Sequence, residues 1–409
     1  MTGPKYRKDG APVNLKKIVI FFLLLCLMPL HAFADITVPQ IKAIAPAEVP
    51  DNEAMKFLQD MGVGWNLGNT FDAYNDSPWM KNEMEIEKYW CQVYTTEQMI
   101  KDIHDAGFST IRIPVSWHNH VSGDDFTISE KWLDRVQTVV DWAYNQGMYV
   151  ILNTHHDCYP EFYYPLEKYA ETSDKYIASI FSQLAERFSE YDQHLIFESM
   201  NEPRLKDTDH EWWFDTASDE CQEALRCINR LNQVFVDTVR AAGGKNADRY
   251  LMVPSYDANP DYTALEGFEL PKDTADNKII VSAHAYTPYS FALQAEGGTA
   301  SFDLNKATQT SEINRFMMGL YRRYIANGIP AVIGEFGARS KDNLQDRVNF
   351  TAYYVAAAQA RNLPCCWWDN NAFRGSGELF GIYDRKTNTW PNPEILQAIM
   401  TNVLDREAE

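Results

Sequence analysis

Basic residues are scarce in this chain of 409 residues, which has 37 Lys and Arg against 57 Asp and Glu and a net charge of −20. Nucleic acids and anionic membranes are bound through clustered Lys and Arg, so this balance disfavours both as partners. The seven cysteines form neither a C-x-x-C pair nor a Cys/His pattern with zinc spacing. A neutral polymer suits such an acidic surface better.

A long apolar run is missing as well. The N-terminal run, residues 18–30, has 13 residues, whereas a helix that spans a bilayer needs ~18 or more. It follows Lys16-Lys17 and precedes Ala32-Phe33-Ala34, an order of basic region, apolar core and A-x-A site that is typical of a secretory signal peptide. We therefore expect residues 1–34 to be a signal peptide cleaved near Ala34, in preference to a retained anchor. The mature protein would be secreted, periplasmic or on the cell surface, without a membrane partner.

Cleavage would leave an even number of cysteines, which in an exported chain permits disulfides. The separation of Cys221 and Cys227 could close a small loop. Cys365 and Cys366 are adjacent within a predicted buried strand, where free thiols are ordinary.

No linker, low-complexity tract or repeat interrupts residues 53–405, which follow a short lead-in at residues 35–52. We predict one domain from 53 to 405. Its eight short apolar runs are Gly62–Gly68, Thr110–Val115, Tyr149–Asn153, His194–Glu198, Tyr250–Pro254, Lys278–Ala283, Ala331–Gly334 and Pro364–Trp368.

Amphipathic stretches such as Ser129–Gln146 and Tyr176–Phe188 lie between these runs and have the spacing of helices with one buried face. Strand alternating with helix eight times predicts an α/β protein, a single-domain (β/α)8 TIM barrel, with an open doubly wound sheet as the alternative. Polar residues stand at the C-terminal end of nearly every run, where barrel active sites lie, which favours the barrel.

Two glutamates define the predicted chemistry. Residues 197–203 (FESMNEP) and 332–337 (VIGEFG) each carry an apolar run into a glutamate, Glu202 or Glu335, before a Pro or Gly. Two carboxylates that reach one barrel mouth from distant parts of the chain are what hydrolysis of a glycosidic bond by a paired acid and nucleophile requires. Further polar or aromatic residues at the predicted rim are Asn66, Asn69, Arg112, His155, His156, Asp157, Asn201, His284, Tyr286, Trp367, Trp368 and Asp369.

With these motifs in this order, the chain resembles glycoside hydrolase family 5 of clan A, and most of all its bacterial endoglucanase and xyloglucanase branch. The resemblance covers nearly the whole chain after residue 34. It implies a retaining endo-β-1,4-glucanase that cleaves plant cell-wall β-glucans, whether cellulose-like chains, mixed-linkage glucan or xyloglucan. No cofactor or metal is expected, the partner is the β-linked polysaccharide itself, and we expect a monomer.

The resemblance also implies roles. Glu202 would be the general acid/base, Glu335 the nucleophile, and Arg112 the cation that keeps the nucleophile charged. Because an acid must hold a proton at working pH, we expect burial and the second carboxylate to raise the pKa of Glu202. The supporting residues would be Tyr286 on the nucleophile, His284 beside the acid/base, Asn201 on the sugar 2-hydroxyl, His155, His156 and Asn69 on other hydroxyls, and Trp368 as a stacking platform. Trp367 would pack inward, Asn66 would brace the rim, and Glu198 is assigned no chemistry.

Three alternatives stay open at this point. The first is an endo-β-1,4-mannanase of the same fold, and the second is a non-catalytic glycan-binding barrel. The third is a metal-dependent hydrolase built on His155, His156 and Asp157, which we disfavour because adjacent residues of a strand diverge. Three aromatic insertions, at 159–169, 209–214 and 286–291, could wall a wide cleft for branched chains. Trp212 and Trp213 would be subsite walls or packing residues.

Overall fold

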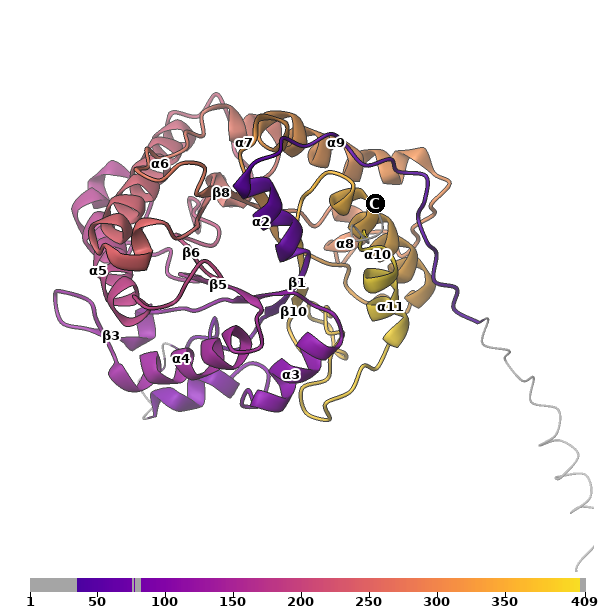
Figure 1. The fold of residues 1–409 in the computed structure, drawn as a ribbon, viewed down its shortest axis with the longest axis horizontal. Helices are drawn as coiled ribbons and strands as arrows, with labels where there is room; N and C mark the ends of the chain where they lie inside the picture. Colours follow the sequence, from indigo (N-terminus) through magenta and orange to yellow (C-terminus); the bar gives the residue numbers. More distant parts are fainter. Residues whose placement is uncertain (1–34, 76, 78–81, 405–409) are drawn as a thin grey trace, which may run out of the picture. The chain divides into compact units, whose positions relative to one another are not determined.

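Eight parallel strands close into a barrel in the computed structural model, which describes residues 35–75, 77 and 82–404 (Figure 1). The predicted signal peptide lies outside the described residues. From Thr37 onward the chain forms one compact unit. The barrel strands are β1 (Val63–Leu67), β2 (Thr110–Ile113), β5 (Tyr149–Asn153), β6 (Leu195–Glu198), β7 (Leu251–Pro254), β8 (Ile279–His284), β9 (Ala331–Phe336) and β10 (Cys365–Asp369).

Each strand overlaps one predicted apolar run, and the order around the barrel is β1-β10-β9-β8-β7-β6-β5-β2. Every residue of these strands is buried, since helices cover the outside of the barrel and side chains fill its inside. The (β/α)8 prediction is therefore confirmed, and the open doubly wound sheet is excluded.

The helices around the barrel follow the amphipathic stretches. In α4 (Glu130–Tyr144) the buried residues are those that the spacing predicts, Trp132, Leu133, Val136, Val139, Val140 and Ala143. The other α-helices are α2 (Glu53–Met61), α3 (Glu97–Asp105), α5 (Ala170–Arg187), α6 (Asp219–Ala241), α7 (Tyr262–Glu266), α8 (Tyr289–Ala292), α9 (Ala307–Arg323), α10 (Leu344–Gln359) and α11 (Pro393–Thr401).

Shorter elements lie in the connecting segments. The 3-10 helices are η1 (Glu83–Lys88), η2 (His118–His120), η3 (Glu167–Tyr169), η4 (Gly244–Ala247), η5 (Tyr256–Ala258) and η6 (Ile325–Asn327). A small antiparallel hairpin, β3 (Val121–Ser122) with β4 (Thr127–Ile128), follows β2 and was not predicted. Its strands have two residues each, too few for an apolar alternation to be visible in the sequence.

The N-terminal end of the barrel is closed by α2. The ring of Phe57 stacks on Tyr250 at 3.7 Å between centroids and meets Tyr149 edge-on at 5.1 Å, and these tyrosines lie at the starts of two barrel strands. The segment at residues 35–52 forms no helix or strand, yet its backbone binds the outer helices, as in the 2.7 Å bond from Ala47 N–H to Ala360 O. This end is sealed, which leaves the C-terminal end for chemistry.

The cysteines of the described residues are all free thiols. Cys221 and Cys227 both lie buried on α6 rather than closing a loop, so the suggested disulfide is wrong, because a rigid helix holds them six positions apart. Cys365 and Cys366 are buried free thiols on β10, as predicted. No helix within the described ranges is long and apolar enough to cross a bilayer.

Candidate active site

Arg112 lies at the centre of the barrel mouth and is fully buried on β2. Its guanidinium donates 2.8 Å bonds to Glu198 Oε2 and Glu335 Oε1. Further bonds run to Asn66 Oδ1 at 3.0 Å and to Asn201 Oδ1 at 2.7 Å. Burial disfavours the charge, but the two carboxylates outweigh it and raise the pKa of Arg112. Arg112 therefore stays cationic and aligns four side chains, which come from β1, β6, β9 and the segment after β6.

Glu198, to which the sequence assigned no chemistry, belongs to the site. Its Oε2 accepts from Arg112 and from Asn153 Nδ2 at 2.9 Å, and its Oε1 accepts from Ser282 Oγ at 2.6 Å. A buried arginine with five donors needs more acceptors than one nucleophile offers. A glutamate inside the β6 apolar run was the available signal, since a buried carboxylate without a partner is rare.

Glu335 lies at the end of β9, 4% exposed, between Arg112 and Tyr286. Tyr286 donates its hydroxyl to Glu335 Oε2 at 2.8 Å. Burial, followed by the charge of Glu335, raises the pKa of Tyr286 well above its usual value, so the phenol remains a donor. Both carboxylate oxygens thus accept a hydrogen bond, in the arrangement that the resemblance implies.

Glu202, four residues beyond β6, accepts a 2.7 Å bond from His284 Nδ1. Arg204 Nη1 is 3.6 Å from the other carboxylate oxygen. Burial alone would raise the pKa of Glu202, but the hydrogen bond and charge of His284 and the charge of Arg204 lower it to about 2. The expectation of a raised pKa is therefore wrong for the free site, because the sequence did not show that two cationic groups would face this carboxylate.

His284 connects the two glutamates. Its Nδ1 is 2.7 Å from Glu202 and 3.8 Å from Glu335 Oε1, and one oxygen of each carboxylate lies within 4.8 Å of the other. Burial lowers the pKa of His284, but the charge of Glu335 and the bond to Glu202 raise it above its usual value. Together these shifts favour the state of the free site in which the imidazole, and not Glu202, carries the proton. The pairing of β8 with β9 shifts in register between Ala283 and His284, and Gly334, the residue passed over, leaves room for the ring, since a Cβ there would lie 3.0 Å from Nε2.

Trp368 forms a flat wall across the mouth from Glu202. It is 7% exposed and lies parallel to His155, with ring centroids 5.7 Å apart. Gly68 makes this position possible, because a Cβ there would lie 2.9 Å from the indole. Trp367 points inward as predicted, buried, with its Nε1–H on Phe380 O at 3.0 Å. The alternation along β10 separates the platform from the packing residue.

Asn69, His155 and His156 gather around Asp72, which is fully buried and was not predicted. Asp72 accepts from the backbone N–H groups of Asn69 at 3.0 Å and Thr70 at 2.7 Å. Its burial outweighs these bonds and raises its pKa to about 7. Burial lowers the pKa of His155 strongly and that of His156 to about 4, so both rings are neutral hydrogen-bonding groups.

Two groups of side chains within the described part of the chain could hold a metal ion. They are Asp72 with His155 and His156, and Glu202 with His284 and Glu335. Asp157, the ligand that the metal alternative required, instead accepts from His118 Nδ1 at 2.7 Å. That alternative therefore fails in the form in which it was stated, because Asp157 points to another partner.

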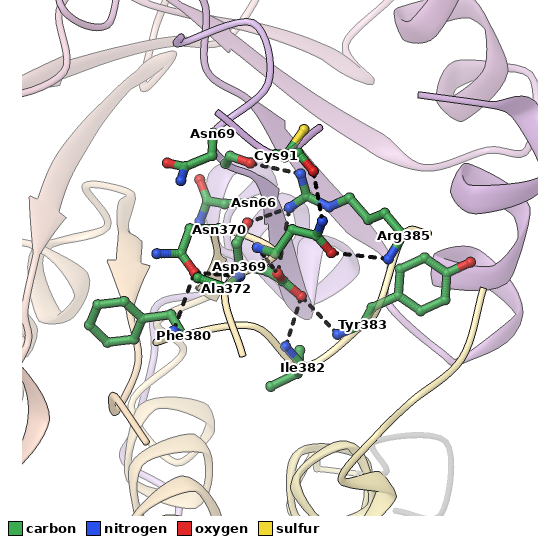
Figure 2. A network of polar contacts seen from close by, with 12 residues as sticks. Asn66, Asn69, Cys91, Asp369, Asn370, Ala372, Phe380, Ile382, Tyr383 and Arg385 are labelled. Atoms are coloured by element: carbon green, nitrogen blue, oxygen red, sulfur yellow. Dashed lines mark hydrogen bonds and ion pairs between the residues drawn. The ribbon is translucent and has the colours of Figure 1, made fainter. Parts of the chain in front are cut away.

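Asp369, the residue after Trp368, and Arg385 belong to one network of polar contacts (Figure 2). Asp369 Oδ2 accepts from Trp65 Nε1 at 3.0 Å and from the backbone N–H groups of Ile382 and Tyr383 at 3.1 and 3.0 Å. The buried Arg385 donates to Gly68 O at 2.7 Å and to the backbone of Asp369. This network ties the segment after β1 to the segment after β10, on either side of Trp368.

The aromatic insertions divide between packing and exposure. Tyr163, Tyr164, Phe214 and Phe291 are buried, so most of these rings stabilise their loops. Trp212, Trp213 and Tyr289 are 61%, 74% and 60% exposed. The guanidinium of Arg204 lies over the indole of Trp212, with its Cζ 3.9 Å from the ring centroid. Of the aromatic residues predicted to wall a cleft, only the exposed ones are therefore available to contact a ligand.

The family model for cellulases of glycosyl hydrolase family 5 matches residues 71–374. The chain belongs to glycosyl hydrolase family 5. This family 5 enzyme is a glycoside hydrolase, and the prediction from its motifs is confirmed.

Similar proteins include an Endoglucanase B of Ruminococcus albus, 41% identical over 88% of this chain and 83% of that protein. A family 5 lichenase of Caldicellulosiruptor sp. F32, solved as a mutant with cellotetraose, is 54% identical with a TM-score of 0.88, covering 90% of this chain and 100% of that one. A broad-specificity endoglucanase of Ruminococcus champanellensis, solved with cellotriose, is 42% identical with a TM-score of 0.80, covering 87% and 100%.

Proposed function

We propose that this enzyme is a secreted endo-β-1,4-glucanase that cleaves plant cell-wall β-glucans with retention of configuration. The observation that carries the proposal is the pair of glutamates, whose nearest carboxylate oxygens lie within 4.8 Å of each other through His284. Retaining enzymes hold their carboxyl groups about 5–5.5 Å apart, whereas inverting enzymes leave roughly 6.5–9.5 Å for a water. The lichenase and endoglucanases to which the chain is similar support the β-glucan substrate.

In this mechanism Glu335 attacks the anomeric carbon. Arg112 and Tyr286 each donate a hydrogen bond to one of its oxygens and fix the carboxylate in the mouth. The glycosidic bond breaks, and a covalent glycosyl-enzyme forms at Glu335. Asn201, fixed by Arg112, would bond the 2-hydroxyl of the sugar in the transition state.

Glu202 transfers the proton to the departing oxygen and later removes one from the attacking water. The proton lies on His284 in the free site, 2.7 Å away along a hydrogen bond. A sugar that covers Glu202 displaces water from it, and desolvation favours the neutral carboxyl. Substrate binding therefore moves the proton from His284 to Glu202, where catalysis needs it.

On the other wall, Trp368 would stack on the C–H face of a pyranose, and His155, His156 and Asn69 would bond its hydroxyls. The two glutamates, Arg112 and Tyr286 are all present and hydrogen-bonded, which argues against a non-catalytic glycan-binding barrel. The exposed Trp212, Trp213 and Tyr289 favour a cleft that also admits branched glucans such as xyloglucan.

Product analysis tests the proposal. The purified enzyme is incubated with mixed-linkage glucan, soluble cellulose derivatives, xyloglucan, xylan and mannan, and the first products are followed by NMR. We expect oligosaccharides from the β-glucans with β-configured new ends. Products of α-configuration would refute retention, and cleavage of mannan alone would establish the mannanase instead.

Secretion and oligomeric state have their own tests. Expression of the full chain in a bacterial host should yield a processed protein outside the cytoplasm whose N-terminus lies near residue 35, read by N-terminal sequencing. Light scattering of this mature protein should give the mass of a monomer. An unprocessed protein in the membrane fraction would favour the retained anchor.

A further inference from the structure

The segments after β6 and β7 are joined just beyond Glu202. The N–H of Asp257 donates to Pro203 O at 2.9 Å, and the N–H of Leu205 donates to the Tyr256 hydroxyl at 3.0 Å. These bonds fix η5 against the segment that begins at the acid/base. Residues of η5 therefore face whatever binds next to Glu202.

The backbone at Asp257 is in the left-handed region, with φ 56° and ψ 22°. Its neighbour Ala258 also has a positive φ of 47°. Non-glycine residues seldom adopt this conformation, and strain of this kind gathers at functional sites. The conformation orients the side chain of Asp257 independently of the strand that precedes it.

The carboxyl group of Asp257 has no hydrogen bond to any residue that the structure describes. Its Oδ1 is buried, while the residue as a whole is partly exposed. A buried carboxyl oxygen without a partner is costly, so such groups call for an explanation. Burial, and then the charge of Glu202, raise the pKa of Asp257 well above its usual value. This shift favours the neutral carboxyl group, a form that can both donate and accept a hydrogen bond.

Arg204 links this carboxyl group to Trp212. Arg204 donates to Glu202 O at 2.8 Å, interacts electrostatically with Asp257, and covers one face of the Trp212 ring. The exposed indole offers an apolar surface of the kind that a sugar ring stacks on. We call Arg204, Trp212 and Asp257 the β6–β7 wall.

The order of the strands places this wall relative to the platform. In the closed barrel, β6 and β7 lie opposite β10 and β1, which carry Trp368 and the segment of Asn69. The bond to be cleaved lies between Glu335 and Glu202, and the departing sugar lies on the side of the residue that protonates it. The β6–β7 wall is on that side.

We propose that the β6–β7 wall binds the leaving-group sugar, with Trp212 stacking on its ring and the Asp257 carboxyl group bonded to one of its hydroxyls. This inference rests on the proposed function and deepens it. The ligand is a neutral β-linked glucosyl unit next to the cleaved bond. Occupation gives Asp257 the hydrogen-bond partner that the protein does not supply.

The test compares two substrates that differ only in the leaving group. Cellotetraose presents a sugar to the β6–β7 wall, whereas a nitrophenyl β-cellotrioside presents a phenol without sugar hydroxyls. The variants are Asp257→Gly, which tolerates the positive φ, Asp257→Asn and Trp212→Ala. Asp209→Asn, at an exposed position on the same segment, and Glu186→Gln, on the outer surface of α5, are the controls.

We expect kcat/KM on cellotetraose to fall about tenfold for Asp257→Gly and for Trp212→Ala, the size of one lost hydrogen bond or stacking contact. On the aryl glycoside both should stay within about twofold of wild type. Asp257→Asn, which keeps a hydrogen-bonding group, should recover part of the loss, and the controls should match wild type on both substrates.

Equal losses on the two substrates, or no loss on cellotetraose, would overturn the assignment. Thermal unfolding shows whether a variant is folded, and Trp212→Ala gives an independent answer because its side chain is exposed. A wild-type enzyme inactive on both substrates would refute the proposed function and this inference together. An active wild type with equal losses in the variants would refute only the inference.

Discussion

The two sides of the barrel mouth are built differently. Around Trp368, which with Asn69, Asp369 and Arg385 we call the β10–β1 wall, buried charges and backbone groups are bonded to one another (Figure 2). On the β6–β7 wall the indole of Trp212 is 61% exposed and the carboxyl group of Asp257 has no partner in the described protein. Apart from Arg385 Nε, the buried polar groups described for the first wall are bonded within the protein, whereas the second wall exposes its indole and leaves the Asp257 carboxyl group without a partner among the described residues.

The difference extends to the glutamates. Glu335 has partners on both oxygens, whereas Glu202 depends on one hydrogen bond from His284 and a longer contact with Arg204. A nucleophile must be held in one place and one charge state, but a proton carrier must change its charge twice in each cycle. The more fixed side therefore holds the nucleophile for its attack on the sugar. The less constrained side holds the residue that transfers the proton and releases the leaving group.

The largest expected effect is on the fixed side. Glu335→Gln keeps the shape and one acceptor oxygen, which can still bind Arg112, but removes the nucleophile, so kcat should fall by about 10⁴-fold or more on every substrate. Steady-state rates on glucan and on an aryl glycoside measure this. Circular dichroism should show an unchanged fold, and residual activity near that of wild type would exclude Glu335 as the nucleophile.

On the other side, the loss should depend on the substrate. Glu202→Gln cannot donate a proton, so kcat/KM on glucan should fall by roughly 10²–10⁴-fold. An aryl glycoside with an acidic phenol needs little protonation, and its first step should be much less affected. Burst kinetics on that substrate separate the two steps. A uniform loss across leaving groups would contradict the role of Glu202 as the acid.

The contrast in rigidity predicts a contrast in stability. Asp369→Ala leaves the buried Arg385 and several N–H groups without their acceptor, which should lower the free energy of unfolding by about 3–5 kcal/mol. Trp212→Ala, at an exposed position, should change it by no more than about 0.5 kcal/mol. Chemical denaturation of both variants measures the difference. Similar losses would show that the two walls are equally important for folding.

The smallest effect concerns pH. The lowered pKa of Glu202 stabilises the fold above its ordinary value of 4.5, and this stabilisation is lost as pH falls towards about 2. The raised pKa of His284 stabilises the fold below its ordinary value of 6.5, and that part is lost as pH rises through the higher folded value. The pair thus contributes most between these ordinary values.

Replacing Glu202 should flatten the dependence of the free energy of unfolding on pH. We expect Glu202→Gln to lose roughly 1–3 kcal/mol of stability near pH 5.5 and less at either extreme, measured as the free energy of unfolding against pH. Glu186→Gln, on the outer surface of α5, is a suitable control. A constant difference at every pH would show that the effect of Glu202 is not due to its charge.

Much of this molecule could be predicted from its sequence because the information is periodic. Buried parallel strands are continuous apolar runs, and the residue after each run must lie at the mouth, which placed Glu202, Glu335, Arg112 and Tyr286 together. The same periodicity does not predict which side chains contact one another within the mouth. Glu198 lies inside an apolar run, and nothing in the spacing indicates that it faces Arg112.

The irregular segments were beyond such reasoning. Asp257 owes its position to a left-handed backbone, and Arg385 reaches Gly68 across 317 positions of sequence. Neither the left-handed backbone nor the long-range contact follows a repeating pattern or a fixed spacing in the sequence. The pKa of Glu202 was mispredicted for the same reason, because its sign depends on which charged side chains of other segments approach it.

The double pairing of Arg112 has a consequence for the whole reaction. When Glu335 becomes an ester in the glycosyl-enzyme, it loses its negative charge, and an arginine with that single partner would be left as an isolated buried cation. Glu198, 2.8 Å from Nε and never consumed, remains as its counter-ion. The barrel centre thus passes from one excess negative charge to neutrality and back, so the intermediate is formed in a site that is electrically balanced for it.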